Sequence, residues 1–96
     1  MNILERIINE FKTYARHKLD EHAIEIKQQY TGTKINDQTR LEIFNKHLDL
    51  LKTELQEKMR DIIKEHKADL NGSVAIPVEL FSVYNSFINE FFKKEF

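Results

Sequence analysis

The sequence predicts an all-α fold built from a long antiparallel helical hairpin and a shorter third helix. One observation is an apolar rhythm that occurs twice along the chain, and another is the presence of only two glycines and one proline in 96 residues. Glycine and proline destabilise the interior of a helix. The Glu, Lys, Ile, Leu and Gln that are abundant here are compatible with a helix. We therefore expect a single helical domain over residues 1–96.

The apolar rhythm repeats at steps of three or four residues, which is the spacing of one helix face. The first run comprises Leu4, Ile8, Phe11, Ala15, Leu19, His22, Ile26 and Tyr30. The second run takes the same steps and comprises Phe44, Leu48, Leu51, Leu55, Met59, Ile62, His66 and Leu70. A repeat of about 3.67 residues per turn predicts nearly straight helices or a gentle right-handed supercoil.

The hairpin is predicted from the ends of these two runs. The first helix is expected at about residues 3–30, with Gly32 in the left-handed position that ends many helices. Asn36 and Asp37 are the candidate N-caps of the second helix, which is expected at about residues 38–70. Because the linker between the two helices is short, they should pack antiparallel.

A third helix is expected at about residues 77–94, with Pro77 at its first position and Glu79 in its first turn. It is too short to cover the whole hairpin. The part of the hairpin that should be thinly covered contains Ala23, Ile26, Tyr30, Ile35, Leu41, Phe44 and Leu48. The third helix also has apolar residues around more than half of its circumference: Leu80, Phe81, Val83, Tyr84, Phe87, Ile88, Phe91 and Phe92. A helix that packs on one side needs a narrower stripe, so this surplus predicts association that completes the fold.

The function expected from this surplus is protein–protein interaction. We expect an accessory, adaptor or inhibitory factor that binds a larger protein partner and forms a homodimer, and the composition suits a bacterial or phage protein. Aromatic residues dominate the energetics of such interfaces. The predicted partner-binding residues are Tyr30, Leu41, Phe44, Phe81, Tyr84, Phe87 and Phe92.

Composition and charge exclude several other classes. The chain has no cysteine, so disulfides and thiolate metal sites are excluded. A net charge of −1 from interleaved acidic and basic residues gives no footprint for nucleic acid. Neither a signal peptide nor a membrane-spanning run is evident, so a cytoplasmic protein is expected. We expect no enzymatic activity, no cofactor, no membrane contact and no small-molecule substrate.

The histidines are candidate metal ligands. His22-x-x-Glu25 and His66-x-x-Asp69 each place two possible ligands on neighbouring helical turns. Their order is the reverse of the Glu-x-x-His pairs that build dinuclear sites in helical bundles, and the acidic residues fall on the polar faces. The sequence therefore favours partly buried packing histidines and predicts no metal site.

One alternative hypothesis is a ribonuclease. The segment from Arg60 to His66 resembles the signature of the HEPN superfamily of helical ribonucleases, in which an Arg and a His act on the scissile phosphate across a dimer interface. The resemblance implies a metal-independent ribonuclease that uses Arg60 and His66 as catalytic residues. Arg40 and His47 satisfy the same loose spacing, and the family's usual bundle has four to five helices.

A second alternative is a nucleic-acid-binding oligomer. Lys12, Arg16 and Lys18 form a small basic cluster in the first helix, which could contact phosphates. Asp20, Glu21 and Glu25 follow within two turns, and this arrangement favours a solvated, salt-bridged surface.

Overall fold

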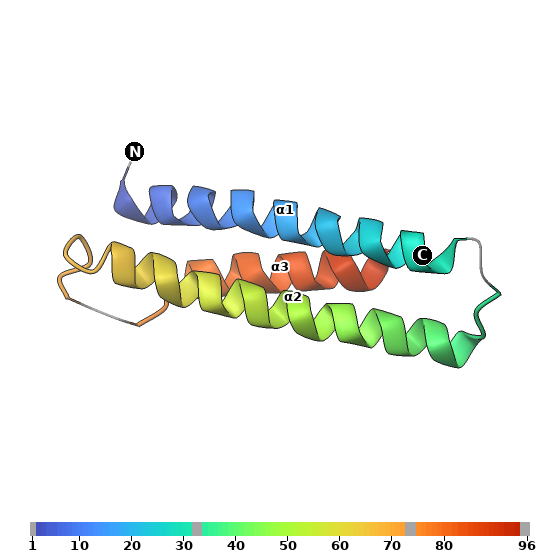
Figure 1. Cartoon of the computed structure of the whole chain (residues 1–96). Helices are drawn as coiled ribbons and strands as arrows, with labels where there is room; N and C mark the ends of the chain where they lie inside the picture. Colours follow the sequence, from blue (N-terminus) through green and yellow to red (C-terminus); the bar gives the residue numbers. More distant parts are fainter. Residues whose placement is uncertain (1, 32–33, 73–74, 95–96) are drawn as a thin grey trace.

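A computed structural model describes residues 2–31, 34–72 and 75–94 of the chain. Within these ranges the secondary structure consists of three helices, α1 (Ile3–Tyr30), α2 (Asp37–Glu65) and α3 (Val78–Lys93). Helices α1 and α2 form an antiparallel hairpin, and α3 runs back along both of them (Figure 1). The molecule is elongated, with extents of 54 × 21 × 17 Å. This arrangement confirms the predicted all-α hairpin with a shorter C-terminal helix.

Side-chain caps fix the starts of the two long helices. The Asn2 side chain accepts a hydrogen bond of 2.8 Å from the backbone N–H of Glu5, at the start of α1. Of the two candidate caps for α2, Asn36 is the one used, and it accepts a bond of 2.8 Å from the N–H of Thr39. These bonds satisfy backbone donors that have no partner within the helix. The predicted role of Gly32 lies outside the described residues.

Helix α2 ends earlier than predicted, at Glu65 rather than at residue 70. From His66 onward the backbone forms hydrogen-bonded turns, and the N–H of Gly72 donates to the carbonyl of Lys67 over 2.9 Å. Asn71 and Gly72 have positive φ angles of 55° and 78°. Two consecutive left-handed residues reverse the chain direction, which a continued helix cannot do.

Helix α3 begins one residue later than predicted, because Pro77 is its N-cap rather than its first helical residue. Pro77 has an extended ψ of 145°, and its carbonyl accepts from the N–H groups of Leu80 and Phe81. Glu79 lies in the first turn and Lys93 in the last turn. Both charges complement the helix dipole, and the place of Glu79 is the one that the sequence predicts.

The core is built from the predicted apolar runs of the hairpin and from one face of α3. Its largest fully enclosed side chains are Ile7, Phe11, Leu19, Ile26, Leu51, Leu55, Met59, Ile62, Ile63, Leu80 and Phe91. The ends of the runs, such as Leu4, Phe44 and Leu70, are half-buried. Burial of this continuous apolar surface supplies the main favourable term for folding.

The prediction of a thinly covered hairpin end is wrong for Ala23, Ile26 and Leu48, which are all buried. The Phe44 ring stacks on Phe91 of α3, with ring centroids 5.2 Å apart. The aromatic rings at the end of α3 therefore reach further along the hairpin than the helix length alone implies. Much of the surplus apolar surface of α3 is used inside the single chain.

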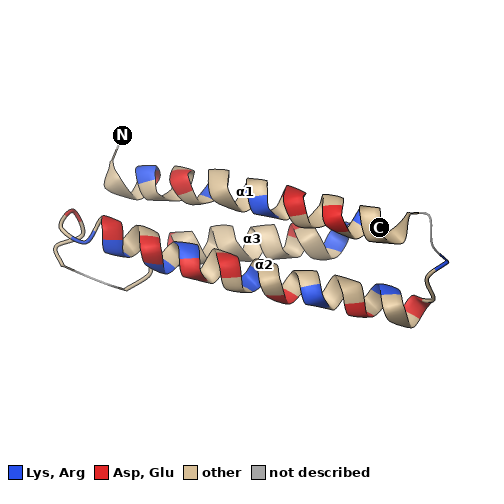
Figure 2. Ribbon diagram, viewed as in Figure 1, with Lys and Arg blue, Asp and Glu red and all other residues tan. Residues whose placement is uncertain are grey.

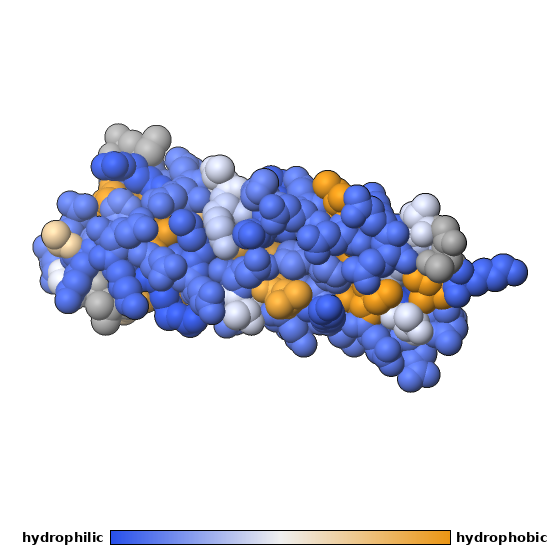
Figure 3. Space-filling view, in the orientation of Figure 1, coloured by the Kyte–Doolittle hydropathy of each residue, from blue (hydrophilic) through white to orange (hydrophobic). Residues whose placement is uncertain are grey.

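Charged residues are spread along the hairpin but are sparse on α3 (Figure 2). The face drawn in Figure 3 is mostly hydrophilic, and its apolar atoms form small separate patches. Among the described residues, no helix is both long enough and apolar enough to cross a membrane.

Candidate functional site

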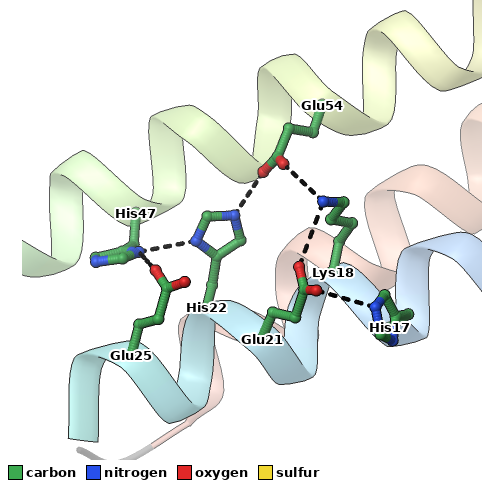
Figure 4. A network of polar contacts seen from close by, with 7 residues as sticks. All are labelled: His17, Lys18, Glu21, His22, Glu25, His47 and Glu54. Atoms are coloured by element: carbon green, nitrogen blue, oxygen red, sulfur yellow. Dashed lines mark hydrogen bonds and ion pairs between the residues drawn. The ribbon is translucent and has the colours of Figure 1, made fainter. Parts of the chain in front are cut away.

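A pair of buried histidines joins the two long helices. His22 lies on the core-facing side of α1, and His47 lies beside Leu48 on the side of α2 that faces α1. The two residues are 7% and 3% exposed, and their Nδ1 atoms are 2.8 Å apart. The rings meet edge to face with centroids 5.0 Å apart. Figure 4 shows the contact between the facing nitrogens of the two rings as a dashed line across the hairpin.

The outer nitrogen of each histidine is held by the opposite helix. His22 Nε2 lies 2.5 Å from Glu54 Oε1 on α2. His47 Nε2 lies 3.1 Å from the side-chain nitrogen of Gln29 on α1. Among the described residues, no buried side-chain nitrogen or oxygen lacks a hydrogen-bond partner. The orientation of both rings is therefore fixed at two points.

The direction of each hydrogen bond follows from the two end groups. A carboxylate only accepts, so His22 Nε2 carries a proton and donates it to Glu54. The Gln29 amide nitrogen only donates, so His47 Nε2 accepts. His47 Nδ1 then carries the proton of that ring and donates to His22 Nδ1. The result is a directional chain from Gln29 through two neutral imidazoles to Glu54.

Glu54 also connects this chain to the surface. Lys18 Nζ lies 3.3 Å from Glu54 Oε2 and 3.3 Å from Glu21 Oε2. His17 Nε2 lies 2.9 Å from the other oxygen of Glu21 (Figure 4). The hydrogen bond to Glu54, and then that to Glu21, raises the pKa of Lys18, and the bond from Lys18 lowers the pKa of Glu21. Lys18 therefore holds one oxygen of Glu54 while the other oxygen accepts from the buried ring of His22.

Burial lowers the pKa of His47 below its ordinary value of 6.5, and the neighbouring His22 lowers it further. Glu25 and Glu54 act in the opposite direction but do not outweigh these causes. A lowered pKa keeps His47 neutral near pH 7, with one ring nitrogen free of a proton. Such an imidazole can accept a hydrogen bond, take up a proton or bind a metal ion.

Two groups of side chains in the described part of the chain have a metal-binding composition. In one, single ligand atoms of His22, Glu25 and His47 lie within 4.8 Å of one another. The other group, whose ligand atoms meet the same limit of 4.8 Å, consists of Glu10, Glu65 and His66. The first differs from the second because both of its histidines are buried and each has a fixed outer nitrogen.

The sequence pattern predicts His22 as a packing residue and does not place His47 opposite it. The sequence nevertheless contains the information from which this contact could be predicted. With a short linker, position i of the first helix faces approximately position 70 − i of the second, as Tyr30 and Arg40 do. That relation places residue 22 opposite residue 48, next to His47. The pairing of the two helices, rather than the periodicity of either one, would have revealed the histidine pair.

The predicted partner-binding residues separate into three groups by their burial. Tyr84 and Phe87 are each only 9% exposed and belong to the core of the single chain. Tyr30 and Phe44 are half-buried, and Tyr30 donates a hydrogen bond to the carbonyl of Arg40. The exposed members are Leu41, Phe81 and Phe92, at 59%, 44% and 55%. The exposed apolar surface is thus smaller than the sequence predicted.

The residues of the ribonuclease alternative lie apart within one chain. Arg60 is exposed on α2, whereas His66 is the half-buried C-cap of that helix. His66 Nε2 lies 3.3 Å from Glu10 Oε2 on α1. Six residues separate Arg60 and His66, so they point in different directions along α2.

The basic cluster of α1 is also divided. Lys18 faces α2 and binds Glu54, whereas Lys12 and Arg16 line a groove of about 430 Å³ between α1 and α3. Arg16 forms two hydrogen bonds with Glu90, one of them 2.9 Å long, and stacks over the Phe87 ring. The groove is completed by Ser82, Val83, Ser86 and Phe87.

Comparison of the chain with models of protein families finds no match, and comparisons with curated proteins and with solved structures find none either.

Proposed function

We propose that this protein is a helical protein–protein interaction module that self-associates through the outer face of α3. The observation that carries the proposal is a stripe of exposed apolar residues on this helix. Val78, Phe81 and Phe92 are 75%, 44% and 55% exposed. Their spacings of 3 and 11 residues place them on one side of a helix, together with Asn85.

A second copy of the chain fits this stripe better than an unrelated surface, because the stripe is complementary to itself. Phe81 and Phe92 lie near opposite ends of α3. If two α3 helices pair antiparallel about a two-fold axis, Phe81 of each copy meets Phe92 of the other. Glu79 near one end then lies close to Lys93 of the other copy, which complements its charge. A net charge of −1 opposes such pairing only weakly.

Light scattering of the full chain over about a hundredfold range of concentration tests the proposal. We expect a dimer that dissociates on dilution, because the exposed stripe is short. Phe92→Glu should shift the protein to a monomer while circular dichroism shows that it keeps its helices. Ile24→Glu is the matched control, since Ile24 on α1 is 56% exposed against 55% for Phe92.

Exchanging the charges of residues 79 and 93 distinguishes this antiparallel pairing from nonspecific association. Glu79→Lys alone should weaken the dimer, and Glu79→Lys combined with Lys93→Glu should restore it. A monomer at every concentration overturns the proposal. So does a dimer that Ile24→Glu disrupts as strongly as Phe92→Glu does.

A further inference from the structure

We propose that His22, His47 and Glu25 form a binding site for a first-row divalent transition-metal ion, of which zinc is the type, that links α1 to α2. The three ligand atoms lie within 4.8 Å of one another. His22 and Glu25 come from successive turns of α1, and His47 comes from α2. This site is independent of the proposed self-association, which uses the outer face of α3.

The distances between the ligand atoms are close to those that a metal ion requires. Zinc bound tetrahedrally at about 2.0–2.1 Å separates neighbouring ligand atoms by roughly 3.3 Å. The Nδ1 atoms of His22 and His47 are 2.8 Å apart, and Glu25 Oε2 lies 3.6 Å from His47 Nδ1. The metal therefore needs the two rings to separate slightly and Glu25 to move inward. Glu25 is free to do so because its side chain is 56% exposed.

The surroundings of the two rings are those of metal-bound histidines. Such histidines usually donate their second ring nitrogen to a carboxylate or carbonyl oxygen, which fixes the ring and strengthens the ligand. His22 Nε2 already donates to Glu54, whose charge Lys18 balances. His47 Nε2 is held by the Gln29 amide. Both rings thus direct Nδ1, and not Nε2, toward the same point.

The metal can bind without loss of a proton from this network. Without metal, the proton between the two Nδ1 atoms belongs to His47, and Gln29 donates to His47 Nε2. When the metal binds both Nδ1 atoms, the His47 proton moves to Nε2, and the Gln29 side chain turns its oxygen to accept it. Both imidazoles remain neutral, and Glu25 supplies one negative charge toward the ion.

The ligand types select the class of metal. Imidazole nitrogen suits zinc, cobalt, nickel and copper, whereas magnesium and calcium prefer sites made of oxygen ligands. Three protein ligands, one of them at the surface, leave a fourth position for water. Acid should weaken binding because protonated histidine cannot ligate a metal.

The test uses the full chain after treatment with a chelator. Calorimetric titration with Zn²⁺ should show that one ion binds per chain. Thermal denaturation should show a higher melting temperature with Zn²⁺ than without it. Co²⁺ should give the intense visible absorption of a tetrahedral site. Glu25→Gln should weaken Zn²⁺ binding at least tenfold with little effect on folding, because the side chain is largely exposed. Asp20→Asn, which removes another exposed carboxylate of α1 that belongs to neither metal-like group, is the matched control and should leave the affinity for Zn²⁺ unchanged.

His47→Gln provides a second test, and it should abolish the Co²⁺ spectrum in a protein whose helicity is checked by circular dichroism. His66→Ala removes the histidine of the other metal-like group and should have no effect on binding. Absence of Zn²⁺ binding at millimolar concentration overturns the proposal. Binding that His66→Ala abolishes, while Glu25→Gln and His47→Gln leave it intact, also overturns it. Because Phe92→Glu leaves the ligands in place, metal binding and self-association can fail separately.

Discussion

The Nδ1 atoms of His22 and His47 lie 2.8 Å apart, although 25 residues separate them in the sequence. One ring donates to the other because Glu54 requires a proton on His22 Nε2 and Gln29 requires an unprotonated His47 Nε2. The shared hydrogen bond can hold one proton between the two Nδ1 atoms but not two. A proton on each Nδ1 would leave two N–H groups facing one another, which would separate the rings and loosen the contact between α1 and α2.

The stability of the protein should therefore fall in mild acid. Burial, together with His22 and Lys46, lowers the pKa of His47 below 6.5, against the opposite effects of Glu25 and Glu54. Between the lowered pKa and 6.5, the unfolded chain binds more protons than the folded chain does. The free energy of unfolding is then greatest above pH 6.5 and decreases as the pH drops through the folded pKa of His47.

Urea denaturation of metal-free protein at about pH 7.5 and about pH 5.5 measures this dependence. Both pH values lie above the ordinary pKa of carboxylates, so these groups stay ionised throughout. His47→Gln should reduce the difference between the two pH values. A variant that keeps the full difference would show that another group is responsible. His17→Gln is the control, because His17 is exposed and lies outside the buried pair.

Phe91→Ala should destabilise the protein by about 3–5 kcal/mol, because Phe91 is fully buried and its removal leaves a cavity. Phe92→Ala, at the next position, should cost about 1 kcal/mol or less, since the ring is 55% exposed. Both rings contact Phe44, so the comparison isolates burial. Equal losses in urea denaturation at low protein concentration would contradict the assigned orientation of α3.

The ion pair between Arg16 and Glu90 should contribute little, although it joins α1 to α3 with two hydrogen bonds. Its side chains are 50% and 40% exposed, and pairs of this kind are worth about 0.2–1 kcal/mol. A double-mutant cycle with Arg16→Gln and Glu90→Gln measures the coupling, which should shrink in concentrated salt. The cycle is required because Arg16 also stacks on Phe87. A coupling of several kcal/mol would show that the pair is shielded from water.

Asn36→Ala should cost about 1 kcal/mol, because the N–H of Thr39 would lose its side-chain acceptor at the start of α2. Asn36→Asp is the matched control and should preserve stability, since aspartate also accepts this bond and complements the helix dipole. The two midpoints of urea denaturation give the difference. Equal stability of the Ala and Asp variants would exclude a capping role for Asn36.

The spacing of apolar residues allowed the helices and most of the core to be predicted, because both follow from the local geometry of a helix. The run from Phe11 to Ile26 on α1 and the run from Leu48 to Ile62 on α2 are buried as their period requires. The α2 terminus was predicted five residues too late. The same apolar spacing continues through His66 and Leu70, but the backbone there forms turns instead of a helix.

The surface could not be predicted in the same way. Periodicity marks α3 as apolar around much of its circumference, but it does not distinguish Phe91, which is enclosed, from Phe92, which is 55% exposed. Both residues are phenylalanine, and the difference arises from how α3 is rotated against the hairpin. That rotation depends on the fit of side chains from all three described helices.

The sequence by itself thus determined which residues form helices and which faces of those helices are apolar, since hydrogen bonds and side-chain spacing within each helix specify both. Only the tertiary structure decided that His22 meets His47, that Glu25 and Glu54 flank them, and how much of α3 remains exposed. These relationships join residues distant in sequence. They depend on the register of α1 against α2 and on the rotation of α3, which are set by packing across the whole bundle.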